Sequence, residues 1–229
     1  CFGCGKGGNI FTFLTEYENY TFTEAMEYLA DRSGIDLPKQ ELTQEAKQEM
    51  DAKALLRSMN KAAAGYFYYI LRNKRGERGL QYLKNRGLSD EIMKKFGLGF
   101  ADIYKDGLYQ YLKSKGFKDS QLKDSGLVTI EERGAYDKFF NRVIFPIVDV
   151  NNRVIGFGGR GLGDGQPKYL NSKETLLFDK SRNLYGLNFA RSTRKHYMIL
   201  CKEDFYIIIC FISQNNIAIW SFNKKRGYR

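Results

Sequence analysis

The chain has 229 residues, 43% of them hydrophobic, which suffices for a packed core in one or two domains. Its net charge of +11 favours a polyanionic partner, nucleic acid first, although attachment to a ribosome or a membrane surface would give the same charge. No apolar run approaches the ~20 residues of a membrane span, and no secretory signal is visible, so we expect a cytoplasmic protein.

A C-x-x-C knuckle, Cys1 to Cys4, opens the chain. Together with the absence of a secretory signal, it favours a reducing compartment and metal binding by Cys1 and Cys4. Tetrahedral zinc needs four ligands, so the pair supplies half of a zinc site. A redox C-x-x-C is the less favoured alternative, because no strand precedes it.

Two helices are expected next. Apolar residues from Ile10 to Tyr17 repeat at helical spacing, and their preferred interpretation is a packed face. Thr21 and Glu24 form a capping box that opens a second helix, which closes near Gly34. We therefore expect a module over residues 1–38, followed by a charged linker or solvated helix over residues 39–54.

A longer helix is predicted from about Ala52 to Leu71, and an internal repeat follows it. QYLKNRGLSDEIMKKFGL at 81–98 returns as QYLKSKGFKDSQLKDSGL at 110–127, an offset of 110 − 81 = 29 residues. Each copy is expected to form a helix, a glycine break and a short helix. We expect these paired helical hairpins to close over the base of a sheet, with Lys84, Arg86, Lys113 and Lys115 as possible contacts to a nucleic-acid backbone.

A β-hairpin is predicted within residues 141–175. Val143 to Val150 form an apolar strand, Asn151 and Asn152 a turn, and Val154 to Phe157 a second strand. Glycines between 156 and 165 are interpreted as exposing backbone to a large ligand, although a tight bulge is the plainer account for any single glycine. Residues 156–161 also spell G-x-G-x-x-G. The sequence GDGQP at 163–167 cannot promptly begin a helix, so a dinucleotide loop is disfavoured.

Cations and polar side chains gather around this hairpin and suit a phosphate-bearing partner. For Tyr169 and Asn171 a structural role is as probable as a role in orienting a base or sugar. The candidate residues for binding DNA or nucleotide are Arg142, Arg160, Lys168, Tyr169, Asn171, Lys180 and Arg182.

The blocks NRVIFPI, VIGFGGR, PKYLNSKET and NLYGL, in this order, resemble the core of the RNA polymerase domain of bacterial DnaG-type DNA primases. CFGCGKGGNIFTFL resembles the end of the same family's zinc-binding domain. The resemblance runs from residue 1 to about residue 201. It implies that two further zinc ligands precede residue 1 and that carboxylates holding magnesium or manganese follow residue 201.

The end of the chain departs from the family pattern. Tyr197 to Cys201 is an expected strand, but Lys202, Glu203 and Asp204 follow where the family has Glu-Gly. We therefore expect an α+β fragment: the end of a zinc ribbon (1–38), a linker (39–54), the N-terminal part of the polymerase domain (55–201) with helices on a small mixed sheet, and an aberrant tail (202–229) in which a Toprim-like subdomain is lost or altered. A frameshift or truncation near residue 201 is the hypothesis that explains the tail.

The resemblance implies a DNA primase, an enzyme that makes short RNA primers on a DNA template. Its partners would be single-stranded DNA, ribonucleoside triphosphates and a replicative helicase. No catalytic residue is assigned in this chain, because the metal-binding carboxylates of the family are missing. The alternative from another class is a non-enzymatic zinc-knuckle module that binds nucleic acid, which would explain the charge and the cysteine pair equally well.

Overall fold

The computed structural model describes residues 7–16, 18, 20–36, 43–132, 134–163, 167–183, 185–190, 199–203, 206–211 and 217–221. Of residues 199–221 it describes the backbone alone. The chain divides into two compact units, residues 1–49 and 50–229, which are described separately below. Cys1 and Cys4 lie outside the described residues.

The first unit contains two packed helices, α1 (Ile10–Glu16) and α2 (Phe22–Ser33). Thr21 is the N-cap of α2, its hydroxyl accepts from the backbone N–H of Glu24, and the Glu24 carboxylate accepts from the N–H of Thr21. Gly34 ends α2 with φ 65°. The predicted capping box and glycine stop are therefore confirmed.

Helix α3 (Gln44–Leu71) starts within the first unit and provides the longest helix of the second. Residues 44–50, which the charge pattern assigned to a linker or solvated helix, form its mostly exposed first turns. The domain boundaries proposed from the sequence stay a prediction, because the helix runs through the expected junction.

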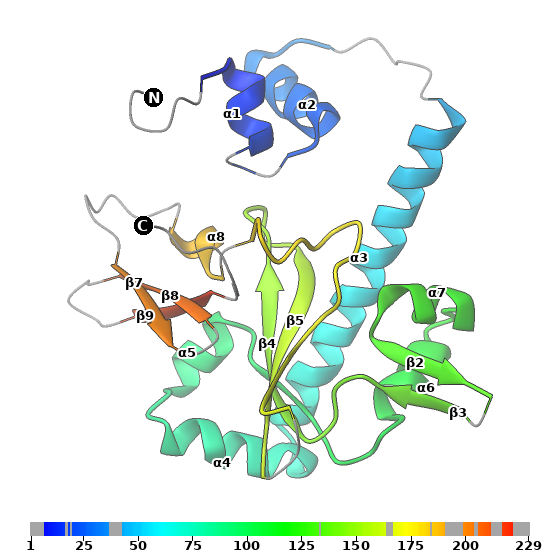
Figure 1. Ribbon diagram of the computed structural model, residues 1–229, viewed down its shortest axis with the longest axis vertical. Helices are drawn as coiled ribbons and strands as arrows, with labels where there is room; N and C mark the ends of the chain where they lie inside the picture. Colours follow the sequence, from blue (N-terminus) through cyan, green and yellow to red (C-terminus); the bar gives the residue numbers. More distant parts are fainter. Residues whose placement is uncertain are drawn as a thin grey trace. The chain divides into compact units, whose positions relative to one another are not determined.

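A four-stranded sheet forms the centre of the second unit, in the order β1-β4-β5-β6, and Figure 1 labels its two long strands, β4 and β5. Every neighbouring pair in it is antiparallel, so the expectation of a mixed sheet is wrong for these strands. Its strands are β1 (Gly99–Ala101), β4 (Arg142–Val148), β5 (Val154–Gly161) and β6 (Tyr169–Asn171). The hairpin of β4 and β5 is as predicted, with Asn152 in the left-handed region at its turn (φ 60°). Residues 156–161 lie within β5, so they do not form a phosphate loop that opens a helix.

Both faces of this sheet are covered. One core cluster joins Val143 and Ile147 to Leu83, Met93 and Phe178, and it involves helices α4 (Glu77–Asn85) and α5 (Asp90–Lys95). The other joins Ile144 and Phe157 to side chains of α3, α6 (Gly107–Ser114) and α7 (Asp119–Ser125). A short hairpin of β2 (Val128–Glu131) and β3 (Gly134–Asp137) lies beside α6 and α7.

The internal repeat is confirmed as a structural duplication. Helices α4 and α5 are separated by Gly87 (φ 79°), and α6 and α7 by Gly116 (φ 90°), again 29 residues apart. Two further contacts recur at that offset. They are the ion pairs Lys84–Asp90 (4.0 Å) and Lys113–Asp119 (2.9 Å), and the cations Arg86 over Tyr82 and Lys115 over Tyr111. The equivalent positions Met93 and Leu122 are both buried, each in its own core cluster.

The interpretation of the β5 glycines as exposed backbone is wrong for the two that can be tested by geometry. A Cβ on Gly159 would lie 2.8 Å from Cδ1 of Phe139, and one on Gly156 would lie 3.2 Å from Cδ1 of Phe178. Both glycines are buried. They make room for aromatic side chains of the protein itself, a reason that differs from the tight bulge considered as the alternative.

Three antiparallel strands, β7 (Ile199–Glu203), β8 (Tyr206–Phe211) and β9 (Ile217–Ser221), form a separate sheet late in the chain. The strand expected over 197–201 coincides with β7 at residues 199–201, and its first two residues lie outside the described residues. A loss or alteration of a Toprim-like subdomain stays a prediction. The remaining elements are η1 (Lys74–Gly76) and α8 (Leu187–Ala190).

Candidate nucleic-acid interface

The strand register places five of the predicted site residues at one end of the central sheet. Arg142 pairs with Gly161, Val143 with Arg160, and Arg160 with Tyr169, while Asn171 pairs with Gly158. The backbone N–H of Gly161 donates to the carbonyl of Lys168 (2.8 Å), which fixes Lys168 beside the end of β5. The hairpin thus brings these residues together as expected.

Arg142 and Arg160 lie on opposite faces of the sheet, which the sequence analysis did not foresee. Directly paired residues share a face, and neighbours along a strand alternate. Arg160 therefore shares its face with Val143 and Tyr169, and Arg142 shares the other face with Gly159. In agreement, a Cβ on Gly159 would lie 3.1 Å from Cδ of Arg142. The two guanidinium groups therefore lie on opposite faces of the sheet.

Arg142 is almost wholly buried, at 5% exposure, and its Nη1 donates to the carbonyl of Lys168 at 3.5 Å. It is preceded by Asn141, a non-glycine residue with φ 47°. Asn141 donates from its backbone to Asp102 and from its side chain to Leu162, at 2.6 and 2.8 Å. These two hydrogen bonds offset the strained backbone conformation of Asn141. We interpret Arg142, whose guanidinium donates to the carbonyl of Lys168, as a structural link between β4 and the residue before β6.

On the face of Arg160, its guanidinium lies 4.8 Å from the ring centroid of Tyr82 on α4. The guanidinium of Arg86, one helical turn further on, lies 6.0 Å from the same ring. Helix α4 and strand β5 thus place two cations around one aromatic side chain. Arg86 was named only as a possible backbone contact, and the spacing of Tyr82 and Arg86 by four residues was the signal for the pair.

Three lysines from different segments form a second cationic group. Lys138 follows β3, Lys173 follows β6, and Lys180 lies further along the chain. Burial and the nearby charges of Lys180 and Lys173 lower the pKa of Lys138 below its usual value. The side chain of Lys173 lies beside the end of α7. A Cβ built on Gly126, which follows α7, would be 2.7 Å from Cε of Lys173. Lys138 and Lys173 were missed, although the cations at 138 and 142 around two aromatics were a visible signal.

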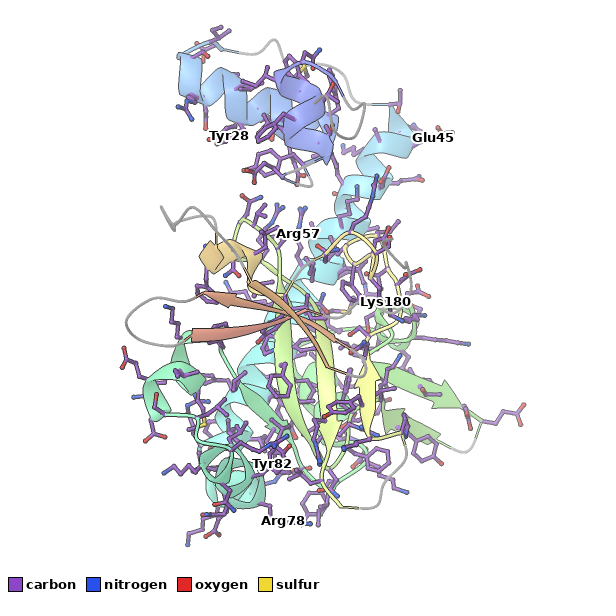
Figure 2. All side chains as sticks on the ribbon, turned by 60° about the vertical axis from the view of Figure 1, so that its left-hand side comes forward. Tyr28, Glu45, Arg57, Arg78, Tyr82 and Lys180 are labelled. Atoms are coloured by element: carbon purple, nitrogen blue, oxygen red, sulfur yellow. The ribbon has the colours of Figure 1, made fainter. Side chains whose placement is uncertain are left out.

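These two groups occupy different parts of the second unit. In Figure 2, Tyr82 lies toward the lower end of the central sheet and Lys180 toward its upper end. Strand β6, at the sheet's edge, carries Tyr169 and Asn171 in the sequence between Lys168 and Lys173. We call Arg86, Arg160, Lys168, Lys138, Lys173 and Lys180 the cationic set.

The other predicted residues, Tyr169, Asn171 and Arg182, differ in what surrounds their side chains. The Tyr169 ring packs against the first core cluster and Lys168 Nζ lies 5.7 Å from its centroid, so a structural role is present. Oδ1 of Asn171 is buried without a hydrogen-bond partner among the described atoms. Arg182 is exposed, and its charge helps lower the pKa of Asp179, after hydrogen bonds from Ser181. Its proximity to that carboxylate favours an ion pair over a nucleic-acid contact.

Two exposed aromatic side chains lie near the backbone hydrogen bond from Asp137 to Lys105: Tyr104 precedes Lys105, and Phe140 follows Lys138 by two residues. Tyr104 is 58% exposed and Phe140 is 42% exposed. The Arg75 guanidinium lies 5.0 Å from the Tyr104 ring centroid, and Lys105 Nζ lies 5.5 Å from that of Phe140. Aromatic faces beside cations suit the stacked bases and phosphates of a single strand. Neither aromatic was a predicted site residue.

The fold is of the α+β class, and lysines and arginines gathered on its surface are typical of proteins that bind nucleic acid. Residues 66–191 match the family "DNA primase catalytic core, N-terminal domain", and residues 1–45 match the "CHC2 zinc finger". The chain therefore belongs to the bacterial DnaG-type DNA primase family, as the sequence blocks indicated.

Two curated relatives illustrate the match. The chain is 44% identical to the DNA primase of Clostridium acetobutylicum, over 83% of this chain and 31% of the relative. It is 42% identical to the DNA primase of Halalkalibacterium halodurans, over 91% of this chain and 35% of the relative. The chain thus spans about a third of these relatives. A match over 91% of 229 residues must extend past residue 201, where the resemblance was expected to end.

Solved structures of DnaG primases also match the fold of this chain. A structure described as the DnaG primase catalytic domain bound to single-stranded DNA superposes with a TM-score of 0.58 and 39% identity, covering 62% of this chain and 46% of that one. The matched part of this chain therefore has the fold of a primase RNA polymerase domain, with mixed helices and sheet.

Among the described residues, no group of three or more His, Cys, Asp or Glu side chains is placed to hold a metal ion. A search of the described helices found none long and apolar enough to cross a membrane. The zinc-finger match supports zinc as a ligand of the family's N-terminal module.

Proposed function

We propose that this chain binds single-stranded DNA template for a DnaG-type primase, an enzyme that synthesises RNA primers for DNA replication. The observation that carries the proposal is the convergence of Lys138, Lys173 and Lys180. Burial, and after it the charges of Lys180 and Lys173, lower the pKa of Lys138, so the charged form of Lys138 is unfavourable in the free protein. A phosphate backbone would offset the repulsion among these charges and release its own counterions.

The arrangement of the site suits an extended single strand. Cations at the two ends of the sheet would contact phosphates at different points along the strand. Tyr104 and Phe140 would offer exposed rings to its bases. Phosphate contacts fix position without reading sequence, so binding would be tolerant of sequence. The same cations could offset the charge of ribonucleoside triphosphates, the substrates of the intact enzyme.

Primer synthesis also requires magnesium or manganese, which would neutralise charge on the leaving pyrophosphate when bound by carboxylates. The described residues offer no such carboxylate group, so they would bind and position the template. Cys1 and Cys4 would contribute two thiolates to the zinc site. Membership of the family supports a replicative helicase as partner and a cytoplasmic location as parts of the same proposal.

The experiment is fluorescence anisotropy of a labelled single-stranded oligonucleotide over a range of salt concentrations. Lys138→Ala and Lys168→Ala should each weaken binding and flatten the log–log salt slope by roughly 0.7. Lys94→Ala, an exposed lysine on α5 outside the cationic set, is the matched control and should leave both unchanged. Unchanged affinity and slope in both test variants would contradict the proposed surface.

A further inference from the structure

Asp137, at the end of β3, is a buried carboxylate that the proposed function does not use. It is 6% exposed and immediately precedes Lys138 of the cationic set. Its Oδ2 accepts from the backbone N–H of Leu108 at 2.7 Å, and its Oδ1 accepts from that of Tyr109 at 2.8 Å. A residue 29 positions from Leu108 in the sequence therefore caps α6.

Helix α6 depends on this distant cap. Its N-cap residue, Asp106, makes no side-chain capping hydrogen bond. The Asp137 backbone N–H also donates to the carbonyl of Lys105 (2.5 Å), and the N–H of Lys138 donates to Leu127 (2.9 Å). Both oxygens and the backbone of Asp137 thus join the segment bearing Lys138 to the start of α6.

The surroundings of Asp137 make its charge costly. Burial raises its pKa to about 7, the nearby charges of Asp106 and Asp102 contribute to the rise, and the two backbone hydrogen bonds oppose it. Tyr66 on α3 faces the same region, and its pKa is raised to about 12 by burial, Asp102 and Asp137. Arg75 on η1 is engaged with Asp102 in an ion pair. A carboxylate held at such a cost suggests a use for its ionised form.

Protonation would change the cap chemically. The ionised carboxylate has two acceptor oxygens, one for each backbone N–H. The protonated group carries an O–H donor at one oxygen and no negative charge, so the N–H group that faces the hydroxyl oxygen keeps only a weak acceptor. The Leu108 bond is buried and the Tyr109 bond is part-buried, so a weaker acceptor loosens the joint between α6 and the segment bearing Lys138.

We propose that Asp137 is a positioning residue whose ionised carboxylate holds Lys138 in the geometry that binds nucleic acid, so that acid weakens template binding. The inference rests on the proposed function. The substitution Asp137→Asn would imitate the protonated state, because an amide has one acceptor and one donor group.

The test measures affinity for a labelled oligothymidylate from pH 5.5 to 8.5 at constant ionic strength. The unmodified chain should lose about three- to tenfold in affinity between pH 8 and pH 6, the effect of about one hydrogen bond of ordinary strength. Asp137→Asn should bind with the lower affinity throughout and show a flat profile. His196→Gln removes the chain's only histidine and should keep the full profile, and Asp119→Asn, an exposed aspartate, should do the same.

The outcomes separate the two proposals. No DNA binding by the unmodified chain at any pH would refute the proposed function itself. Binding that is flat with pH, or that keeps its slope in Asp137→Asn, would overturn the role of Asp137 alone. If that variant does not fold, carboxyl-carbon NMR of the unmodified chain decides, because an Asp137 midpoint below about 5 would overturn the inference.

Discussion

Replacing Gly159 with alanine tests whether the β5 glycines serve internal packing. The new Cβ would lie 2.8 and 3.2 Å from two carbons of the Phe139 ring and 3.1 Å from Cδ of Arg142. Phe139 is 1% exposed and belongs to the second core cluster, so its ring has little room to move. Overpacking of this kind typically costs about 1–3 kcal/mol, and we expect Gly159→Ala to lower the free energy of unfolding by that amount.

Gly65→Ala is the matched control. Gly65 lies inside α3, no atom lies within 4 Å of the place that a Cβ on it would occupy, and its φ is not positive. Alanine there should raise stability by roughly 0.5–1 kcal/mol, because glycine is a poor helix former. Urea unfolding followed by circular dichroism measures both variants. If Gly159→Ala is as stable as the unmodified chain, the glycine is not required by packing and the exposed-backbone interpretation regains its basis.

Three further predictions concern Tyr104, Arg160 and Asp137. Tyr104→Ala should weaken single-strand binding by about 1–3 kcal/mol without changing the salt slope, whereas Tyr69→Ala, which removes a 67% exposed ring from α3, should have no effect in the same anisotropy assay. Arg160→Ala should weaken DNA binding and flatten the salt slope by roughly 0.7, and Arg160→Lys should restore the slope if charge is what matters. Because the pKa of Asp137 is raised from 3.8 to about 7, folding favours the protonated form between these values. The free energy of unfolding should therefore fall by about 2 kcal/mol from pH 5.5 to 8.5, and by much less in Asp137→Asn.

The sequence predicted several helix ends and turns correctly, because each of them is determined by residues close together in the chain. The capping box at Thr21, the glycine stop at Gly34 and the Asn152 turn each depend on neighbours within a few residues. The 29-residue repeat is also present in three dimensions, including its ion pairs. Two copies of one local pattern therefore formed the same local structure twice.

Interactions between distant segments account for what the sequence left out. Lys138, Lys173 and Lys180 meet only because β6 and the segment after β3 come together beside α7. The opposite faces of Arg142 and Arg160 follow from the register of β4 and β5, which an apolar pattern does not fix at a glycine-rich strand. The cap that Asp137 provides for α6 is a contact across 29 residues that no motif announces.

The stability and the function of the Asp137 region make opposite demands. A neutral side chain at this position would avoid the cost of a buried charge, and the fold would gain stability near neutral pH. The two backbone bonds to Leu108 and Tyr109 need the ionised form, and they join α6 to the segment that carries Lys138. An aspartate whose pKa is close to 7 is therefore best explained by what its charge holds in place. If Asp137→Asn proves more stable at pH 8.5 yet binds DNA more weakly, the two demands are separated in a single variant.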